Sequence, residues 1–185
     1  IIAKTYSARQ RGLLVKGLKA HAWDDCLARI DFHSAQATAV AHGERLFAVG
    51  LSNGKFHLYD SVSLQEIRIA NHGERVKILR FSSDDKLLVS NGLRHVRLWN
   101  PMSCTQIWSL TTSYQTVALM FTANDELINI ACGDNLLRTI KAFEGAEINC
   151  VNLIENGHDD FLGRRTHQPP SLAVFSNDCN MLAIN

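Results

Sequence analysis

The clearest indication of the fold is Val96-Arg97-Leu98-Trp99-Asn100, because two further segments of the chain repeat its form at a nearly fixed distance. Phe56-His57-Leu58-Tyr59-Asp60 precedes it and Leu137-Arg138-Thr139-Ile140-Lys141 follows it, each at a distance of about 40 residues. Each segment alternates, and each ends on a bulky residue followed by a polar one. Alternation of period two is typical of a half-buried β-strand. A regular spacing between such strands predicts an architecture of repeated units.

The same register holds outside this strand. Ser103 to Ile107 lies one period after Ser63 to Ile67, and Thr116 to Thr122 lies one period after Val76 to Ser82. Turn-forming residues such as Ser83-Asp84-Asp85 separate the alternating segments. Four short strands in each period of about 40 residues, with no convincing helical stripe between them, are typical of the antiparallel blades of a β-propeller.

The sequence therefore predicts an all-β chain, a partial β-propeller of about 3.5–4 four-stranded antiparallel blades. A β-sandwich of irregular strands is the alternative, but it does not explain the strict period. We expect further sequence on both sides, because the chain begins at Ile1 rather than Met and stops at Asn185 inside a predicted strand. The predicted blades cover residues 33–70, 71–110 and 111–151, with lead-in strands and a partial first blade at 1–32, an inserted loop at 152–170, and the truncated start of the next blade at 171–185.

Composition and charge argue against several classes of function. The 185 residues are 46% hydrophobic and 20% charged, and the formal net charge of +1 gives no long-range attraction for nucleic acid or anionic lipid. No apolar run approaches the roughly 20 residues of a membrane span. The five cysteines are odd in number and widely spaced, without a CxxC pair, so we expect reduced thiols in a cytoplasmic protein.

The sequence contains no recognisable catalytic, cofactor or metal motif. Gly12 and Gly17 have the spacing of a phosphate-binding loop, but Leu18 stands where that loop needs lysine. The eight histidines form no HExxH or HxH pattern and no cluster with cysteine. No Gly-x-Ser-x-Gly elbow marks a serine nucleophile. We therefore expect a protein that is not an enzyme, binds no cofactor or metal, and acts on a protein partner or an adjoining domain of its own chain, with no nucleic acid or membrane involved.

The repeats resemble those of the WD-repeat family of β-propellers. His72 and Val76 stand four apart, as in the family's Gly-His opening, and Val96 to Asn100 resembles its V-R-L-W-D ending. In that family a His, a Ser/Thr, an Asp and the Trp form a hydrogen-bonded tetrad inside the blade. Here Leu93 stands where the Asp belongs, while His72 and Trp99 are kept. The resemblance therefore implies incomplete tetrads and blades that depend more on apolar packing.

A narrower resemblance links the chain to the propeller region of fungal NACHT proteins. The matching stretches are Gly17 to His42, Phe47 to Gly54, and the Pro169-Pro170 pair that leads into Phe175-Ser176. Those proteins carry a nucleotide-hydrolysing NACHT module upstream of the propeller, resemble NOD-like receptors of innate immunity, and are linked to non-self recognition. The resemblance implies that this chain is the sensing or scaffolding part of a signalling ATPase. The alternative is an intramolecular lid that restrains the upstream ATPase.

Loops between strands are the candidate partner-binding surface, because rigid blades hold such loops on one rim. We expect the recognition loops at residues 71–75, 91–95, 111–115 and 132–135. Trp108 lies in a predicted outer strand, where it either packs in the core or contributes to an interface. The inserted loop is either a tolerated insertion or a contact segment of aromatic and basic character. The predicted partner-binding residues are His72, Arg75, Arg94, Trp108, Phe161, Arg164 and Arg165.

Overall fold

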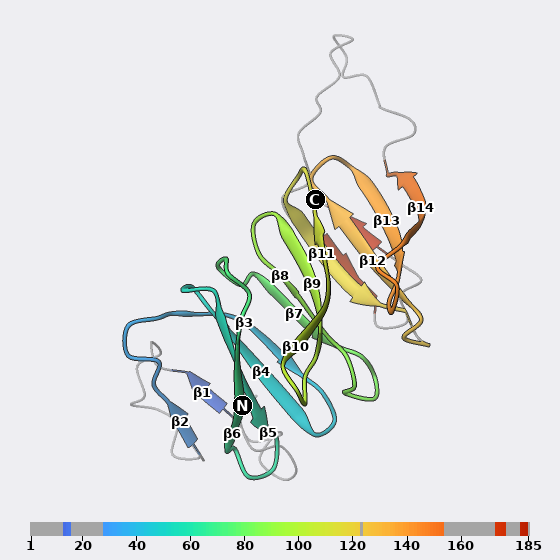
Figure 1. The fold of residues 1–185 in the computed structure, drawn as a ribbon. Coiled ribbons are helices and arrows are strands. Elements are labelled where there is room, and N and C mark those ends of the chain that lie inside the picture. Colours follow the sequence, from blue (N-terminus) through green and yellow to red (C-terminus); the bar gives the residue numbers. More distant parts are fainter. Residues whose placement is uncertain (1–12, 16–27, 123, 154–172, 177–181, 185) are drawn as a thin grey trace, which may run out of the picture.

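The computed structural model describes residues 13–15, 28–122, 124–153, 173–176 and 182–184 (Figure 1). Every regular element in this part of the chain is a β-strand. The described residues therefore include no helix that could cross a membrane. The short alternating segments of the sequence provide the strands, since period two places one face of each strand in an apolar interior.

Three four-stranded antiparallel sheets follow one another along the described chain, and within each sheet every strand pairs with the next strand in sequence. The first sheet comprises β3 (Ala37–His42), β4 (Leu46–Leu51), β5 (Lys55–Asp60) and β6 (Glu66–Asn71). The second sheet comprises β7 (Ile78–Phe81), β8 (Leu88–Asn91), β9 (His95–Asn100) and β10 (Thr105–Thr111). The third sheet comprises β11 (Thr116–Phe121), β12 (Leu127–Cys132), β13 (Leu136–Lys141) and β14 (Glu147–Asn152).

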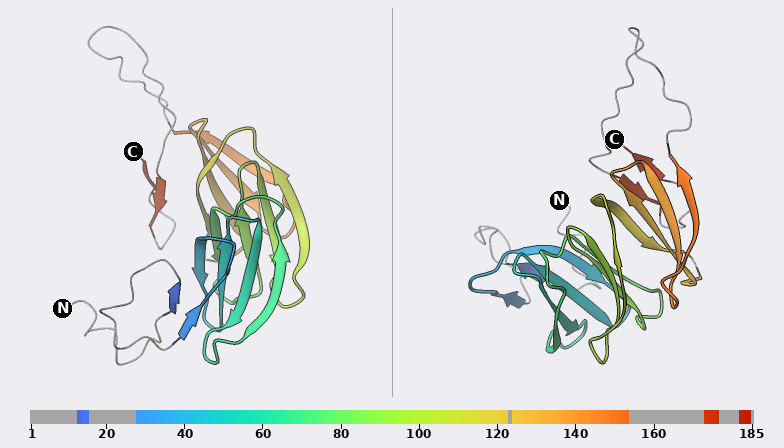
Figure 2. Two further views of the ribbon diagram at one scale, coloured as in Figure 1. Left: turned by 90° about the vertical axis from the view of Figure 1, so that its left-hand side faces the viewer. Right: turned by 45° about the horizontal axis from the view of Figure 1, so that its top comes forward.

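The sheets are arranged side by side as successive blades (Figure 1, Figure 2). The first strands of neighbouring sheets contact one another, β3 with β7 and β7 with β11. These strands therefore lie on the inner side of the curved row of sheets. The second strands β4 and β8 are buried throughout, whereas the fourth strand β14 is exposed throughout. This arrangement is a partial β-propeller of four-stranded antiparallel blades, as the sequence predicted.

Apolar side chains fill the space between neighbouring sheets. Gly50 allows the first two sheets to approach closely, because a Cβ at this position would lie 2.5 Å from Cγ1 of Val76. We call the cluster between the first and second sheets the first interface; its buried members are Ala41, Ala48, Phe56, Leu58, Ala70, Val76, Leu79, Leu88 and Trp99. The corresponding cluster between the second and third sheets contains, among others, Val96, Leu98, Leu119, Phe121, Ile128, Ile130 and Ile140.

A carboxylate from each of two turns holds the turn of the preceding sheet. Asp85, between β7 and β8, is buried and accepts hydrogen bonds of 2.6–3.2 Å from the backbone N–H groups of residues 44–46. Asp125 is its equivalent in the next repeat and accepts a hydrogen bond of 2.7 Å from the backbone N–H of Ser83. Both aspartates have a positive φ, 57° and 58°, a conformation that Asp adopts more readily than most residues. The period of the sequence therefore also positions polar links between blades.

Two shorter pairs of strands flank the sheets. β15 (Ala173–Phe175) and β16 (Leu182–Ile184) are antiparallel, and β15 contacts β11 as the first strand of a further blade would. β1 (Leu13–Val15) and β2 (Ala28–Ile30) instead pair in parallel. Neighbouring strands of a propeller blade are antiparallel, so this pair differs from the blade strands that the sequence predicts within residues 1–32. The rest of that segment lies outside the described residues.

Candidate functional site

The loops at one rim of the blades lie next to one another, although they are far apart in the sequence. The backbone N–H of His72 donates to the carbonyl of Gly54 at 2.8 Å, and that of Thr112 donates to the carbonyl of Arg94 at 2.7 Å. These bonds join each connection between two sheets to a turn within the preceding sheet. We call this surface the loop rim; it comprises residues 52–54, 72–77, 92–94, 112–115 and 133–135.

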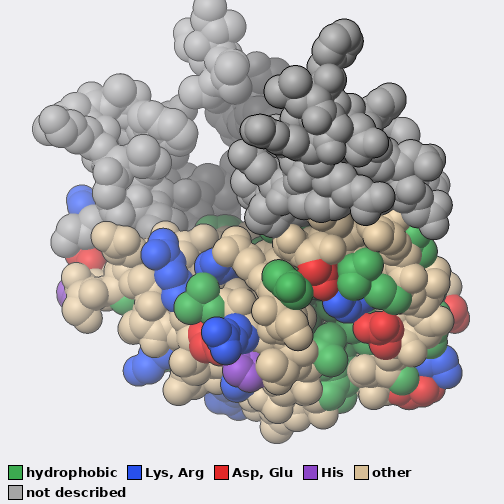
Figure 3. Space-filling model, turned by 90° about the horizontal axis from the view of Figure 1, so that it is seen from above, with side chains coloured by type: hydrophobic (Ala, Val, Ile, Leu, Met, Phe, Trp, Pro, Cys, Tyr) green, Lys and Arg blue, Asp and Glu red, His purple; other side chains and the backbone are tan. Residues whose placement is uncertain are grey.

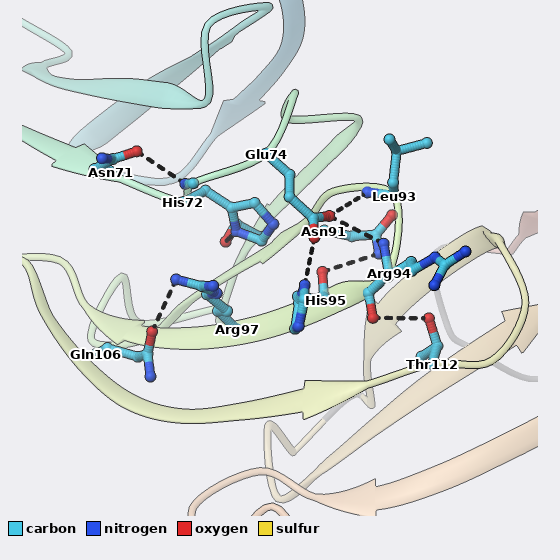
Figure 4. A network of polar contacts seen from close by, with 12 residues as sticks. Asn71, His72, Glu74, Asn91, Leu93, Arg94, His95, Arg97, Gln106 and Thr112 are labelled. Atoms are coloured by element: carbon cyan, nitrogen blue, oxygen red, sulfur yellow. Dashed lines mark hydrogen bonds and ion pairs between the residues drawn. The ribbon is translucent and has the colours of Figure 1, made fainter.

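Glu74 is the centre of a polar network at the loop rim (Figure 4). Its Oε2 accepts hydrogen bonds from the backbone N–H groups of Leu93 (2.7 Å) and Arg94 (3.0 Å), and its Oε1 contacts Nδ1 of His95. Burial opposes ionisation of Glu74, but these contacts outweigh it and lower its pKa to about 2. The ionised carboxylate therefore fixes the turn between β8 and β9 against the connection between β6 and β7.

His72 is wholly buried, so the prediction that it contacts a partner is wrong. Its Nδ1 lies 2.7 Å from Oγ of Ser90, and Nε1 of Trp99 donates to the same oxygen at 2.7 Å. His72, Ser90 and Trp99 are thus joined as in the WD-repeat tetrad. The carboxylate that binds the turn between β8 and β9 comes from Glu74 and not from residue 93. The tetrad of the second sheet is therefore incomplete, as the resemblance implied, and apolar clusters pack on both faces of this sheet. The sequence did not single out Ser90, because a serine in a buried strand gives no signal of its own.

The pKa of His72 predicts a loss of stability in mild acid. Burial, together with the positive charge of Arg97, lowers this pKa to about 4 from an ordinary value of 6.5. Between these values the unfolded chain binds a proton at His72 and the folded chain does not, so stability falls as the pH drops from 6.5 toward 4. We expect the free energy of unfolding to decrease by about 1–1.5 kcal/mol between pH 7.5 and pH 5.5 from this group alone.

Urea unfolding at the two pH values measures this effect. The variant His72→Gln keeps a polar side chain of similar size without the titration, so its stability should depend less on pH by that amount. An unchanged pH dependence in His72→Gln would show that His72 does not titrate as the structure indicates.

Arg75 and Arg94 occupy exposed positions of the loop rim. The exposed side chains of Leu93 and Tyr114, at 54% and 56%, lie on the same rim, within two of the predicted recognition loops, but were not singled out as contact residues. No pattern in the sequence marks them, because an apolar residue in a turn does not reveal whether a neighbouring loop covers it. The predicted contact residues Phe161, Arg164 and Arg165 lie outside the described residues.

Trp108 joins two blades. Its Nε1 donates to the carbonyl of Ala142 at 2.7 Å, across the boundary between the second and third sheets. Gly145 makes room for the indole ring, since a Cβ there would lie 3.0 Å from Cγ of Trp108. The ring is half-buried against the cluster between these sheets. Of the two predicted roles of Trp108, the structure therefore supports packing inside the molecule.

The face seen from above has a mixed chemical character (Figure 3). Basic, acidic and apolar side chains are interspersed over its described part, with no broad area of one kind. Among the residues that the structure describes, no group of three or more His, Cys, Asp or Glu side chains is placed to hold a metal ion.

Comparison with known proteins shows similarity in fold. No protein-family model matches the sequence, and no curated protein matches it. The computationally designed Ika4 protein has a TM-score of 0.64 and 17% identity, over 82% of this chain and 86% of that chain. The RRP9 WD40 repeats have a TM-score of 0.60 and 15% identity, over 64% of this chain and 39% of that chain. A chain of the Mitotic Checkpoint Complex has a TM-score of 0.60 and 21% identity, over 67% of this chain and 42% of that chain.

These similarities define the class of fold. The chain is a partial β-propeller with WD-repeat-like blades, which agrees with the motifs of its sequence. It spans about two fifths of the length of the RRP9 and checkpoint chains.

Proposed function

We propose that this chain is a non-catalytic protein-interaction module that binds a protein partner, or an adjoining domain of its own chain, at the loop rim. The network around Glu74 is the observation that carries this proposal. It fixes two loops, so that Arg75, Leu93 and Arg94 are exposed on a rigid support. Rigid loops lose less conformational entropy on binding than mobile loops. Tyr114 adds an exposed aromatic ring, a residue type that is enriched in interfaces.

The proposed partner is a protein, with no role for nucleic acid or a membrane, and the proposed compartment is the cytoplasm. A net charge of +1 supports the exclusion of nucleic acid, which generally requires a strongly basic surface. Arg75 and Arg94 favour a partner surface with carboxylates or other hydrogen-bond acceptors, because a guanidinium group donates and does not accept.

Alanine at both Arg75 and Arg94 is expected to weaken partner binding at least about tenfold, because arginine is enriched among the residues that dominate interface energies. The native chain, immobilised, serves to capture the partner, and titration of the captured protein then gives the dissociation constant. The matched control is Arg45→Ala with Lys86→Ala, which removes two exposed charges from turns at the opposite rim. Equal affinity of the Arg75→Ala, Arg94→Ala double variant and the native chain would rule out this surface.

A more specific role follows from the resemblance to fungal NACHT proteins. In this role the propeller senses a ligand for an upstream signalling ATPase; in the alternative it is a lid that restrains that ATPase. Both require a longer protein that contains residues 1–185 and a NACHT module. Deletion of residues 1–185 from that protein separates them. Raised basal ATP hydrolysis supports the lid, whereas unchanged hydrolysis with loss of partner capture supports the sensor or scaffold.

A further inference from the structure

A cavity of about 240 Å³ lies on the side of the first sheet that faces away from the second sheet. Each water molecule in the liquid takes about 30 Å³, so the cavity has room for a side-chain head group. We call it the His57 cavity; its walls include Phe32, Asn53, Lys55, His57, Tyr59 and Glu66.

The third sheet shows what occupies the equivalent space in a complete blade. There the guanidinium of Arg138 donates to Oδ2 of Asp134 at 2.6 Å and to Oδ1 at 3.3 Å. Its Nε lies 3.6 Å from Oε2 of Glu147 on the fourth strand. An arginine of the third strand is therefore held between a carboxylate of the preceding turn and a carboxylate of the fourth strand.

The second sheet repeats this arrangement in a weaker form. Arg97 stands one repeat before Arg138 and donates to Oε1 of Gln106 on the fourth strand at 3.3 Å. Both arginines lie on the face of their sheet that is turned toward the preceding blade, because each is two residues from a side chain buried there, Trp99 or Ile140. The position therefore carries a guanidinium group in each of the two later sheets.

The first sheet has a histidine at this position. His57 pairs with Ile69 as Arg97 pairs with Ser109, so its place in the sheet is the same. The fourth-strand carboxylate is kept as Glu66, and Asn53 stands where the third sheet has Asp134. An imidazole is shorter than an arginine side chain, so the substitution leaves space, and that space is the His57 cavity.

Of the two carboxylates that hold Arg138, the walls of the His57 cavity keep one as Glu66, while Asn53 provides an amide oxygen in place of the other. Nδ1 of His57 lies 2.7 Å from Oε2 of Glu66, which leaves Oε1 of Glu66 without a hydrogen bond in the described part of the chain. The Glu66 side chain is 42% exposed, so a group from outside can reach it. The half-buried ring of Phe32 also lines the cavity and provides a surface on which a planar cation stacks.

We propose that the His57 cavity binds the guanidinium group of an arginine side chain from a protein partner. The incoming arginine would pair with Glu66 and take the place that Arg138 occupies in the third sheet. This inference rests on the proposed interaction function and names a feature of the partner, an exposed arginine. It concerns a different surface from the loop rim, so the two are tested separately.

Lys55 is the group that opposes this binding. Its side chain is exposed and lines the cavity, and it makes no ion pair among the described residues. Replacement of Lys55 by alanine removes a like charge and should tighten arginine binding by about twofold to fivefold. Weaker binding after this change would contradict the proposed position of the cation.

The test is a titration of the full chain with Nα-acetyl-arginine methylamide, followed by NMR of the aromatic side chains. We expect saturable shifts at the rings of Phe32, His57 and Tyr59, with a dissociation constant on the order of 1 mM, as for a small ligand with few contacts. The neutral analogue Nα-acetyl-citrulline methylamide has nearly the same shape and should not bind. Equal binding of both compounds, or no saturable shift with the arginine compound, would overturn the proposal.

Two variants test the site itself. His57→Arg supplies the missing guanidinium from inside and should abolish binding of the arginine compound while leaving thermal stability unchanged or higher. Glu66→Gln should weaken binding at least about fivefold, since it removes the charge that pairs with the guanidinium. Glu147→Gln, the same change at the equivalent position of the third sheet, is the matched control and should have no effect. Retained binding in His57→Arg would show that the compound binds elsewhere.

These experiments separate the inference from the function on which it rests. If the arginine compound does not bind but Arg75→Ala with Arg94→Ala reduces partner capture, the His57 cavity is not a binding site and the loop rim remains one. If the arginine compound binds as expected, His57→Arg should also weaken capture of the partner. Capture that His57→Arg leaves unchanged would show that the partner does not use this cavity.

Discussion

Replacement of Trp99 by alanine is expected to lower the free energy of unfolding by roughly 3–5 kcal/mol. The Trp99 side chain is 5% exposed and belongs to the first interface. Its ring contacts that of Phe56 edge-on, with ring centroids 5.2 Å apart. Alanine would leave a cavity between two blades and would remove the N–H donor to Ser90. Chemical denaturation followed by circular dichroism gives the loss directly.

The variant Trp99→Phe separates packing from hydrogen bonding. Phenylalanine keeps an aromatic ring beside Phe56 but cannot donate to Ser90, so we expect a smaller loss of about 1–2 kcal/mol. This variant also keeps the experiment informative if Trp99→Ala does not fold. A stability of Trp99→Ala within about 1 kcal/mol of the native value would show that the first interface does not depend on this side chain.

Replacement of Asp85 by alanine is expected to lower the free energy of unfolding by roughly 2–4 kcal/mol. Its buried carboxylate accepts three backbone hydrogen bonds from residues 44–46, and hydrogen bonds to an ionised acceptor are stronger than those between neutral groups. Alanine would leave these N–H groups without their acceptor at the junction of the first and second sheets. Denaturant unfolding measures the loss, with Asp125→Ala as a weaker equivalent between the second and third sheets.

Two further substitutions identify the cause of the Asp85 effect. Asp85→Gly relieves the positive φ of 57° but restores no hydrogen bond, so it should remain close to Asp85→Ala in stability. Gly43→Ala disturbs the same contact from the other side, because its Cβ would lie 1.7 Å from Oδ1 of Asp85. We expect the losses from Gly43→Ala and Asp85→Ala to be far from additive. Recovery of native stability in Asp85→Gly would assign the loss to backbone conformation and not to the hydrogen bonds.

The sequence predicted the surface of the protein less well than its fold. Arg75 and Arg94 occupy exposed positions of the loop rim, but His72 is buried and Trp108 joins two blades. The resemblance to WD repeats implied an interior tetrad position for His72, whereas its place at a strand connection suggested the surface, and only the first of these agrees with the structure. Exposure depends on the adjacent blade, and the spacing of residues within one repeat does not contain that information.

Glu74 illustrates the same limit. The resemblance to WD repeats directed attention to residue 93, where leucine replaces the usual aspartate. The structure shows that Glu74, from the connection before β7, binds the backbone of the turn in its place. Glu74 and residue 93 are 19 positions apart in the sequence. That the carboxylate of Glu74 does the work expected of an aspartate at residue 93 becomes visible only when the fold brings the two segments together.

Alternation and turn chemistry in the sequence predicted the strands and the repeated blade, because both act over a few residues and the regular period makes them recur. The recurrence of the Val96 to Asn100 pattern at intervals of about 40 residues revealed the register of the repeats. The contacts between blades are visible only in the tertiary structure. Examples are the hydrogen bonds of Asp85 to the backbone of residues 44–46 in the first sheet and the cavity next to His57, where a shorter side chain leaves space. These properties depend on the distance between blades, and packing against a neighbour sets that distance.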